Sequence, residues 1–315
     1  MLVTGGAGYI GSHVVREALA AGHSVWAVDD LSTGVENRLD SAVERIDLNL
    51  AAADAEARLT DILRKTKFDA VIHLAARKQV GESVEKPEEY YRDNIGGLAN
   101  LLLAMRATDH DTLVFSSSAA TYGMPDVDSV SESDVPTPIN PYGETKLIGE
   151  WMIRNAKNWG LRGVCLRYFN VAVTGATGLA DTAALNLIPI AIGQLRRGET
   201  PKVFGDDYPT PDGSCIRDYV HVSDLAVAHI MAIDYLQQEE REFDVFNVGT
   251  GTGASVFEVL SALREASGID FEPEVAPRRA GDPPKLVANV SRIQQVLGFK
   301  AEKNLVDIID SAWNL

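Results

Sequence analysis

The 315-residue chain contains few cysteines, no long apolar run and no basic run, and each of these gaps excludes a class of protein. Its two cysteines, Cys165 and Cys215, lack CxxC spacing, so we expect buried free thiols in a reducing compartment, by default the cytoplasm. No apolar run approaches the roughly 18 residues of a membrane span, and no basic-then-apolar signal segment is present. We therefore expect neither a membrane-spanning nor an exported protein.

Charge and histidine content exclude two further classes. The net charge is −16, and the charges are spread along the chain, so neither nucleic acid nor an anionic membrane surface is an expected partner. The six histidines are scattered singly without an HExxH-type cluster, and we expect no metal. What remains is an ordinary globular enzyme composition and a length that suggests about two domains.

The first half of the chain alternates short β-rich runs with longer helical patterns. The expected strands are Met1–Thr4, Ser24–Val28, Val43–Ile46, Phe68–Leu74, Thr112–Ser116 and Arg162–Arg167. The helical stretches between them, each long enough for a crossover, are Tyr9–Ala21, Glu56–Thr66, Glu88–Arg106 and Pro141–Asn158. This rhythm predicts an α/β fold with a doubly wound parallel sheet of the Rossmann type.

After Arg167 the pattern changes to shorter helices and loops rich in Gly, Pro, Asp and Thr. We place a domain boundary near Tyr168, with residues 1–168 in the first domain and residues 169–315 mainly in a smaller C-terminal α/β domain. A segment of about 219–248 ends in the strand pattern Asp244–Val248 and is expected to return to the first domain. Loops are expected at Val173–Thr182 and Gly205–Ser214, and helices at Leu185–Arg197, Ser223–Gln237, Ser255–Ala266 and Leu305–Leu315.

A glycine motif with Gly5, Gly8 and Gly11 follows the first expected strand and opens a helix. This spacing allows a tight turn to bring backbone amides and a helix N-terminus against a pyrophosphate. Asp29 and Asp30 end the next strand, where a carboxylate can accept both ribose hydroxyls of NAD and would repel the 2′-phosphate of NADP. The motif predicts NAD as cofactor, with a turn cap as the alternative role of Asp30.

Tyr142 and Lys146 are four residues apart after a strong helix start at Asn140-Pro141, so they share one helical face. A tyrosine with a pKa of about 10 is ionised in only about one molecule in a thousand at pH 7. One cation about 6 Å away lowers that pKa by about two units, so a phenolate base needs a second cation, which a ligand would supply. By itself, such a pair is more often a half-buried ring under a solvated lysine.

With the serines Ser116 to Ser118 at an expected strand end, these motifs resemble those of the extended short-chain dehydrogenase/reductases, and more narrowly those of the UDP-glucose (UDP-galactose) 4-epimerase family. The resemblance covers nearly the whole chain. Its most specific segments are Lys78–Ser83, Phe115–Ser118, Leu166–Asn170, Phe204–Thr210, Cys215–Val222 and Ala276–Asp282. Their order and spacing carry the resemblance, because no single segment does.

The resemblance implies a reversible isomerisation of a UDP-sugar with tightly bound NAD. Tyr142 would take the proton of the sugar 4-hydroxyl while the hydride on C4 passes to NAD+, and the 4-keto sugar would turn over before the hydride returns. Ser118 would hydrogen-bond the reacting oxygen, and Lys146 would bond the nicotinamide ribose. Family members are typically homodimers, here paired through the helices expected at Glu88–Arg106 and Pro141–Asn158.

The same resemblance implies two sets of binding residues. Taken singly, each has an ordinary role as a core filler, solvated charge or turn cap, and only the ordered set favours function. Besides the three glycines and two aspartates, the cofactor set is Tyr9, Ile10, Asp47, Leu48, Leu74, Ala75, Lys78, Asn94, Tyr142, Lys146 and Tyr168. The substrate set is Ser118, Tyr142, Phe169, Asn170, Asn186, Leu187, Phe204, Arg217, Tyr219, Arg279, Asp282 and Leu286.

Three positions bear on the choice among related activities. Ala119 and Ala120 replace the Asp-Glu pair of 4,6-dehydratases and the glutamate of decarboxylating relatives, so they favour simple 4-epimerisation. Leu286 stands at the family's gate between plain and N-acetylated hexoses, and leaves UDP-N-acetylhexosamines and UDP-pentoses open. A cofactor-releasing 4-reductase or dehydrogenase and a non-catalytic NAD sensor are further alternatives, although sensors commonly lose the tyrosine or lysine.

Overall fold

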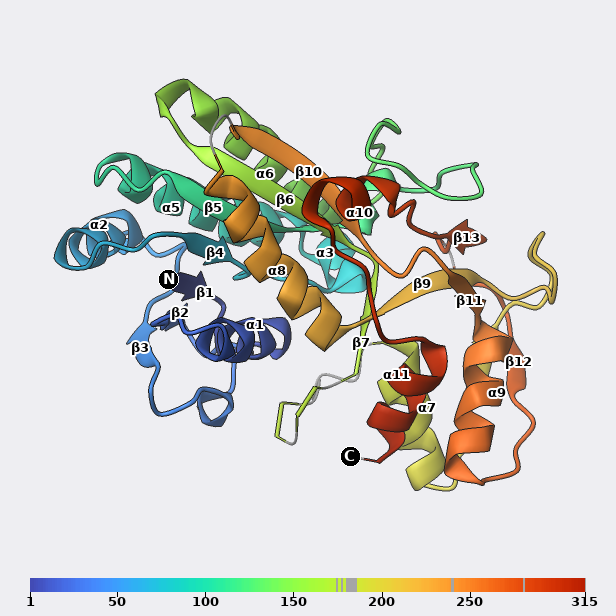
Figure 1. The fold of residues 1–315 in the computed structure, drawn as a ribbon. Coiled ribbons are helices and arrows are strands. Elements are labelled where there is room, and N and C mark those ends of the chain that lie inside the picture. The colour runs from blue at the N-terminus through green and yellow to red at the C-terminus, as the bar shows by residue number, and fades with distance from the viewer. Residues whose placement is uncertain (174, 177, 180–185, 239–240, 280, 315) are drawn as a thin grey trace. The chain divides into compact units, whose positions relative to one another are not determined.

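The computed structural model describes residues 1–314 except residues 174, 177, 180–185, 239–240 and 280 (Figure 1). The chain divides into two compact units. The first comprises Met1–Gly123, Pro136–Arg167 and Ala226–Phe246, and the second comprises Met124–Val135, Tyr168–Leu225 and Asn247–Leu315.

The described part of the first unit is built on a seven-stranded sheet with the order β10-β6-β5-β4-β1-β2-β3. Strand β1 pairs in parallel with both β2 and β4, and β2 with β3 and β4 with β5 are parallel as well. The order reverses between β1 and β4, which is the point where such sheets bind ligands. The strands are β1 (Leu2–Thr4), β2 (Trp26–Asp29), β3 (Glu44–Asp47), β4 (Val71–His73), β5 (Thr112–Ser118), β6 (Arg162–Tyr168) and β10 (Phe243–Val248). The doubly wound sheet predicted from the sequence is confirmed.

Helices cover both faces of this sheet. Figure 1 shows α2, α5 and α6 on one face and α1 and α8 on the other. Leu59 and Leu63 of α2, Leu101 of α5 and Ile153 of α6 share one buried core with Phe115 of β5. The bounds are α1 (Tyr9–Ala20), α2 (Ala55–Lys65), α3 (Val80–Glu85), α4 (Pro87–Tyr90), α5 (Gly97–Arg106), α6 (Pro141–Ala156) and α8 (Val222–Leu236), with short 3₁₀ turns at Glu36–Arg38, Ala119–Tyr122 and Lys157–Trp159.

The helix predicted at Glu88–Arg106 is not one regular α-helix. It consists of α4, a π-helical turn η2 (Tyr91–Gly96) and α5. Such wider turns occur frequently at functional sites. The apolar pattern of Tyr90, Leu98 and Leu101 runs through the whole stretch, so periodicity alone does not separate the two kinds of helix.

The described part of the second unit contains a small sheet in which β9 pairs with β7, β11 and β13, and a separate pair formed by β8 and β12. Its core joins Ile188 of α7, Leu260 of α9 and Ile308 of α11. The bounds are β7 (Asn170–Ala172), β8 (Lys202–Phe204), β9 (Ile216–His221), β11 (Gly253–Ser255), β12 (Glu274–Ala276), β13 (Lys285–Leu286), α7 (Leu187–Arg196), α9 (Val256–Ser267), α10 (Ser291–Leu297) and α11 (Leu305–Trp313). The expected helix start at Leu185, the helix end at Leu315 and part of the loop expected at Val173–Thr182 lie outside the described residues.

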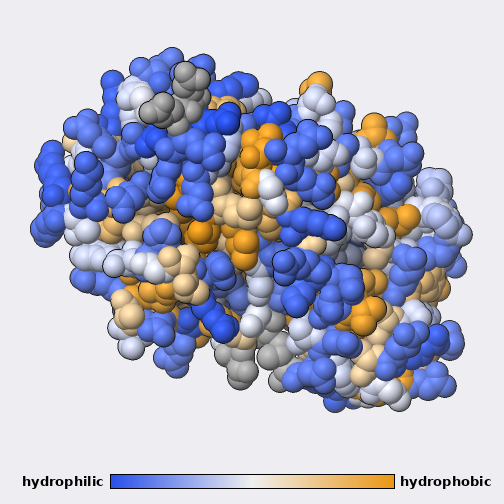
Figure 2. Space-filling view, in the orientation of Figure 1, coloured by the Kyte–Doolittle hydropathy of each residue, from blue (hydrophilic) through white to orange (hydrophobic). Residues whose placement is uncertain are grey.

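The surface is mainly hydrophilic. Hydrophilic side chains cover most of the face drawn in Figure 2, with smaller apolar areas between them. Cys165 and Cys215 are buried free thiols, as predicted. Among the helices of the described residues, none is both long and apolar enough to cross a membrane.

Candidate active site

The glycine motif forms the tight turn that a dinucleotide pyrophosphate needs. Gly5 has a φ of +73°, and a Cβ on Gly11 would lie 1.9 Å from the Gly5 carbonyl oxygen, so a side chain at Gly11 would block the turn. Gly8 is the N-cap of α1 and supplies no side-chain cap, and the first turn of α1 holds no acidic residue. The N-terminus of α1 is therefore suited to an anionic group, and the residues present fit NAD.

Asp29 and Asp30 differ in their surroundings. The Asp29 carboxylate is buried and accepts the Ala7 amide at 3.0 Å and the Leu31 amide at 2.9 Å. Burial is the main cause that raises the Asp29 pKa, and the two amides partly offset it. Each carboxylate oxygen keeps a second lone pair, so Asp29 can still accept a ribose hydroxyl beside the glycine turn.

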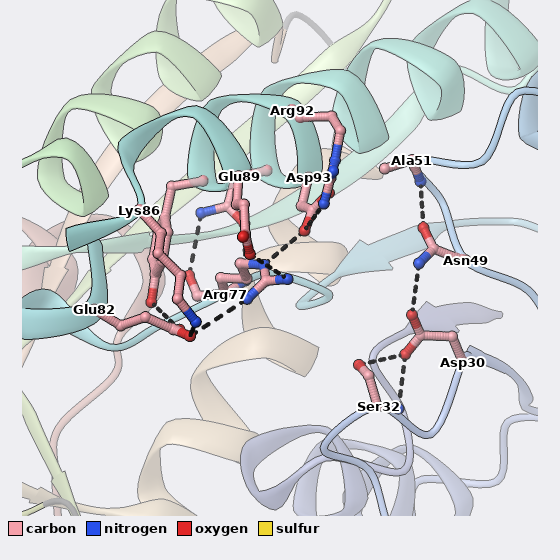
Figure 3. Close-up of polar contacts among 12 residues, drawn as sticks. Asp30, Ser32, Asn49, Ala51, Arg77, Glu82, Lys86, Glu89, Arg92 and Asp93 are labelled. Atoms are coloured by element: carbon pink, nitrogen blue, oxygen red, sulfur yellow. Dashed lines mark hydrogen bonds and ion pairs between the residues drawn. The ribbon is translucent and has the colours of Figure 1, made fainter. Parts of the chain in front are cut away.

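Asp30 is occupied by local contacts. One of its carboxylate oxygens accepts the Ser32 amide at 2.9 Å and the Ser32 hydroxyl at 2.6 Å, and the other accepts the Asn49 side-chain amide at 2.9 Å (Figure 3). These are the contacts of a turn cap, the alternative role that the sequence left open for Asp30.

Helix α6 places Tyr142 and Lys146 beside the end of β5. The Asn140 side chain caps the helix by accepting the Gly143 amide at 2.8 Å. A Cβ on Gly143 would lie 2.6 Å from the Ala120 carbonyl oxygen, so the absence of a side chain allows the first turn of α6 to approach residues 119–122 closely. The Lys146 ammonium donates to the Ser116 carbonyl at 2.7 Å and lies 5.8 Å from the centre of the Tyr142 ring.

Ser118, the last residue of β5, completes this group. Its hydroxyl oxygen accepts the Ala120 amide at 3.1 Å, and its hydrogen bond with the Tyr142 phenol favours the phenolate. The structure thus brings Tyr142, Lys146 and Ser118 together at the carboxyl end of a central strand.

Burial controls the ionisation of this group. It raises the pKa of Tyr142 above its ordinary value of 10.0, an effect only partly offset by Ser118. It also lowers the pKa of Lys146 to about 7, because the buried site favours the neutral amine. In the chain alone, burial therefore raises the Tyr142 pKa against an opposing contribution from Ser118, and the lowering that the sequence predicted from Lys146 is not among the causes. The need for a second cation is correspondingly greater.

The other residues of the cofactor set in the first unit lie mainly at the carboxyl ends of strands. A Cβ on Gly5 would lie 2.7 Å from the Ala75 nitrogen and 3.0 Å from the Leu74 carbonyl carbon, so the turn after β1 meets the loop after β4. The Lys78 ammonium lies 5.6 Å from the centre of the Tyr9 ring. Leu48 and Asn94 are buried, Ile10 is half-buried, and Asp47 ends β3 with an exposed side chain 3.9 Å from the Arg45 guanidinium.

The substrate set and Tyr168 belong to the second unit except for Ser118 and Tyr142. Arg217 of β9 is opposite Leu286 of β13 and donates to the Pro283 carbonyl at 2.7 Å. Asp282 lies between two arginines, 3.6 Å from the Arg217 guanidinium and 3.2 Å from that of Arg279. The Arg279 guanidinium lies 4.5 Å from the centre of the Phe204 ring. The two arginines thus lie together, with one shared carboxylate.

The remaining members of the substrate set are less concentrated. Asn170 of β7 is opposite Tyr219 of β9, and burial raises the Tyr219 pKa to about 12. Leu187 packs against the same core as Tyr219, whereas Asn186 is exposed at the start of α7. Tyr168 and Phe169 are buried, and the Phe169 amide donates to the Val248 carbonyl at 3.1 Å.

The sequence of this chain matches a known family along most of its length. A sequence model of the NAD dependent epimerase/dehydratase family matches residues 1–249. The chain belongs to this family. It is 44% identical to the UDP-glucose 4-epimerase of Corynebacterium glutamicum in an alignment of 319 residues, gaps included, which covers 99% of this chain and 94% of that protein.

Solved structures agree with the family. The structure of UDP-glucose 4-epimerase from Brucella ovis in complex with NAD has a TM-score of 0.93 and 40% identity, covering 99% of this chain and 97% of that one. The structure of UDP-glucose-4-epimerase from Stenotrophomonas maltophila with bound NAD and formylated UDP-arabinopyranose has a TM-score of 0.93 and 37% identity, covering 99% and 96%. The resemblance predicted from the motifs is confirmed at the level of the family, and so is the fold.

Two polar residues of this region were absent from the predicted sets. Thr145 donates to the Tyr142 carbonyl at 2.8 Å and accepts the Asn94 side-chain amide at 3.0 Å. His73 ends β4 with its Nδ1 atom 2.7 Å from the Thr4 hydroxyl, and burial, aided by the Lys146 charge, lowers the His73 pKa to about 3. A threonine inside the tyrosine–lysine motif and a histidine at a strand end were signals available in the sequence.

The lowered Lys146 pKa predicts a pH dependence of stability. Because the folded pKa of about 7 lies below the ordinary value of 10.5, the unfolded chain binds more protons on this residue between about pH 7 and 10. Relative to Lys146→Met, the free energy of unfolding of the cofactor-free wild type should therefore rise by at most about 1.4 kcal/mol per pH unit across this range. Urea unfolding at a series of pH values measures it, with Lys157→Met, a half-exposed lysine, as control. A difference that stays constant from pH 7 to 10 would contradict the buried lysine.

Proposed function

We propose that this protein catalyses the NAD-dependent, reversible 4-epimerisation of UDP-hexoses, with UDP-galactose and UDP-glucose as the substrate pair. The observation that carries the proposal is the group of Tyr142, Lys146 and Ser118 at the carboxyl end of β5, in the same unit as a glycine turn that fits NAD. The names of its relatives, UDP-glucose 4-epimerases with NAD or UDP-sugars bound, support the same assignment.

Tyr142 acts as the base that takes the proton of the sugar 4-hydroxyl and later gives it back. Bound NAD+ supplies the hydride acceptor and the positive nicotinamide that serves as the second cation. Ser118 hydrogen-bonds the reacting oxygen, and its own bond to the phenol keeps the two groups in line. Lys146 holds the nicotinamide ribose, and its charge adds to the stabilisation of the phenolate.

In this proposal the other cofactor residues hold NAD around the glycine turn. Asp29 accepts the adenosine ribose hydroxyls, and Lys78 and Asn94 bond cofactor ribose or phosphate. Asp47, Leu48, Leu74, Ala75 and Tyr168 line the adenine and nicotinamide positions. The first domain, residues 1–168 with a returning segment of about 219–248, is accordingly the proposed NAD-binding domain.

The second domain is the proposed UDP-sugar-binding domain. Arg217 and Arg279 bind the diphosphate, because a guanidinium fork matches phosphate oxygens, and Asp282 orients both arginines. Phe169, Asn170, Asn186, Leu187, Phe204 and Tyr219 surround the nucleotide and sugar. Tight binding of UDP with loose binding of the hexose permits the 4-keto sugar to rotate, so that its opposite face meets the cofactor.

The alternatives differ in substrate or in chemistry. Ala119 and Ala120 begin the 3₁₀ turn directly after Ser118 and carry no acid or base, so dehydration and decarboxylation are not proposed. Leu286 leaves UDP-N-acetylhexosamines and UDP-pentoses as alternative substrates. A UDP-pentose derivative is bound in the Stenotrophomonas maltophila structure, which keeps that alternative in view.

The central experiment incubates the purified protein with UDP-galactose and no added NAD and quantifies UDP-glucose. We expect conversion to equilibrium without net NADH, and at least about a hundredfold slower turnover for Tyr142→Phe, because packing survives while the base is lost. Parallel assays with UDP-N-acetylhexosamines and UDP-pentoses define the substrate range. Failure with every UDP-sugar despite bound NAD would favour the sensor, net NADH would favour a dehydrogenase, and near-normal turnover of Tyr142→Phe would contradict its role as base.

We also propose a cytoplasmic homodimer paired through the segments Glu88–Arg106 and Pro141–Asn158. Leu103 of α5 and Trp151 of α6 support it, because these large apolar side chains are 47% and 46% exposed in the single chain.

The dimer predicts a change of mass on charging this face. Wild type should have about twice the chain mass of 34.1 kDa by light scattering, whereas Trp151→Glu should approach the single-chain mass. Val306→Glu, which changes a 58% exposed valine on α11, should remain dimeric. A monomeric wild type, or a dimeric Trp151→Glu, would rule out this interface.

A further inference from the structure

The loop between β4 and α3 is fixed on both sides of Lys78. The Asn94 side chain accepts the Arg77 amide at 2.8 Å and donates to the Arg77 carbonyl at 3.1 Å. The Tyr90 hydroxyl accepts the Gln79 amide at 2.9 Å and lies 2.7 Å from the Gln79 carbonyl. Lys78 itself is exposed, so the direction of its flexible side chain depends on the backbone between these two contacts.

The Arg77 side chain ties this loop to the helices that follow it. Its guanidinium lies 2.6 Å from the Asp93 carboxylate, 3.0 Å from that of Glu89 and 3.6 Å from that of Glu82 (Figure 3). The side chain is only 33% exposed. The three carboxylates raise the pKa of Arg77 still further, so its charge is permanent.

Neighbouring cations balance this cluster. Lys86 pairs with Glu82 at 3.3 Å, and Arg92 pairs with Asp93 at 2.6 Å, and both lysine and arginine side chains are at least half exposed. Figure 3 shows Arg77 among the three acidic residues, with Lys86 and Arg92 at the edges of the cluster. Arg92 therefore shares Asp93 with Arg77, which makes it a matched control.

Two adjacent residues of the π-helical turn η2 bind Arg77, one at its side chain and one at its backbone. Asp93 binds the Arg77 guanidinium, and Asn94 binds the Arg77 backbone. Asn94 also donates to Thr145, which adjoins Lys146. One turn of helix thus connects the Lys78 loop to the tyrosine–lysine motif.

We propose that Arg77 is a positioning residue for Lys78: the three carboxylates hold Arg77, and Arg77 holds the loop in the conformation in which Lys78 retains NAD. The inference rests on the proposed function, in which Lys78 contacts the cofactor. Lys78 already lies 5.6 Å from the Tyr9 ring in the first turn of α1, the turn that fits the pyrophosphate. In this proposal Arg77 acts through Lys78.

The test measures how fast bound NAD leaves the purified holoprotein, by chromatography of the nucleotide released after dilution. Arg77→Leu should speed release by about tenfold, Arg77→Lys should restore part of the loss, and the control Arg92→Leu should change release by less than about twofold. In a Lys78→Ala background, Arg77→Leu should add less than about twofold, because the side chain that it positions is gone. Thermal unfolding of each variant checks that the fold is retained.

Three outcomes would overturn the inference. The first is an unchanged rate of NAD release in Arg77→Leu, and the second is an equal increase of that rate in Arg92→Leu. The third is that Arg77→Leu speeds release by the same factor in the Lys78→Ala background as in the wild type, which would mean that Arg77 stabilises the fold without acting through Lys78. The UDP-galactose assay separates these from failure of the proposed function. A wild type that converts UDP-galactose while Arg77→Leu retains NAD normally overturns only the positioning role. A wild type that binds NAD and converts no UDP-sugar overturns only the function, and one purified without nucleotide overturns both.

Discussion

The site depends on burying a phenol and an ammonium side by side. Burial raises the pKa of Tyr142 and lowers that of Lys146 to about 7, so the chain alone favours the neutral forms of both. A buried phenol without a nearby full charge is a poor base at neutral pH. A ligand that brings a positive charge opposes this preference at Tyr142, because it stabilises the phenolate. A base that needs its cofactor for ionisation is inactive in the cofactor's absence. The chemistry is thereby coupled to cofactor binding.

The fold supplies this environment by ending parallel strands at one edge. The glycine turn follows β1, Asp29 ends β2, the Lys78 loop follows β4, and Ser118 ends β5, all within the first unit. Because β1 and β4 flank the reversal of strand order, their loops meet, as the close approach of Gly5 to Ala75 shows. Helix α6 approaches β5 closely enough to add Tyr142 and Lys146, since Gly143 has no side chain.

The strands of the first sheet were predictable within a few residues, because most of them contain a short apolar run bounded by glycine or polar residues. Strand β3, Glu44–Asp47, is the exception, since only Ile46 is apolar. The small strands of the second unit were not, since pairings such as Leu286 with Arg217 join distant segments with no local pattern. The π turn at Asn94 keeps the apolar periodicity of an α-helix and so escaped prediction. Arg77 escaped too, because in the sequence its partners Glu82, Glu89 and Asp93 look like ordinary polar residues of a helical stretch, whereas the structure buries them partly around Arg77. The roles of the individual site residues stay predictions, since sequence pattern gives their order but neither their burial nor their charge state.

We infer that Tyr142 becomes a usable base only when its cofactor supplies a second positive charge. The most direct measurement is an ultraviolet titration of tyrosine ionisation, taken as wild type minus Tyr142→Phe, with NAD+ present and after its removal. We expect the Tyr142 signal to titrate above pH 10 in the cofactor-free protein and at least about two pH units lower with NAD+. An equal pKa in both forms, or a phenol already ionised near neutral pH without cofactor, would contradict it.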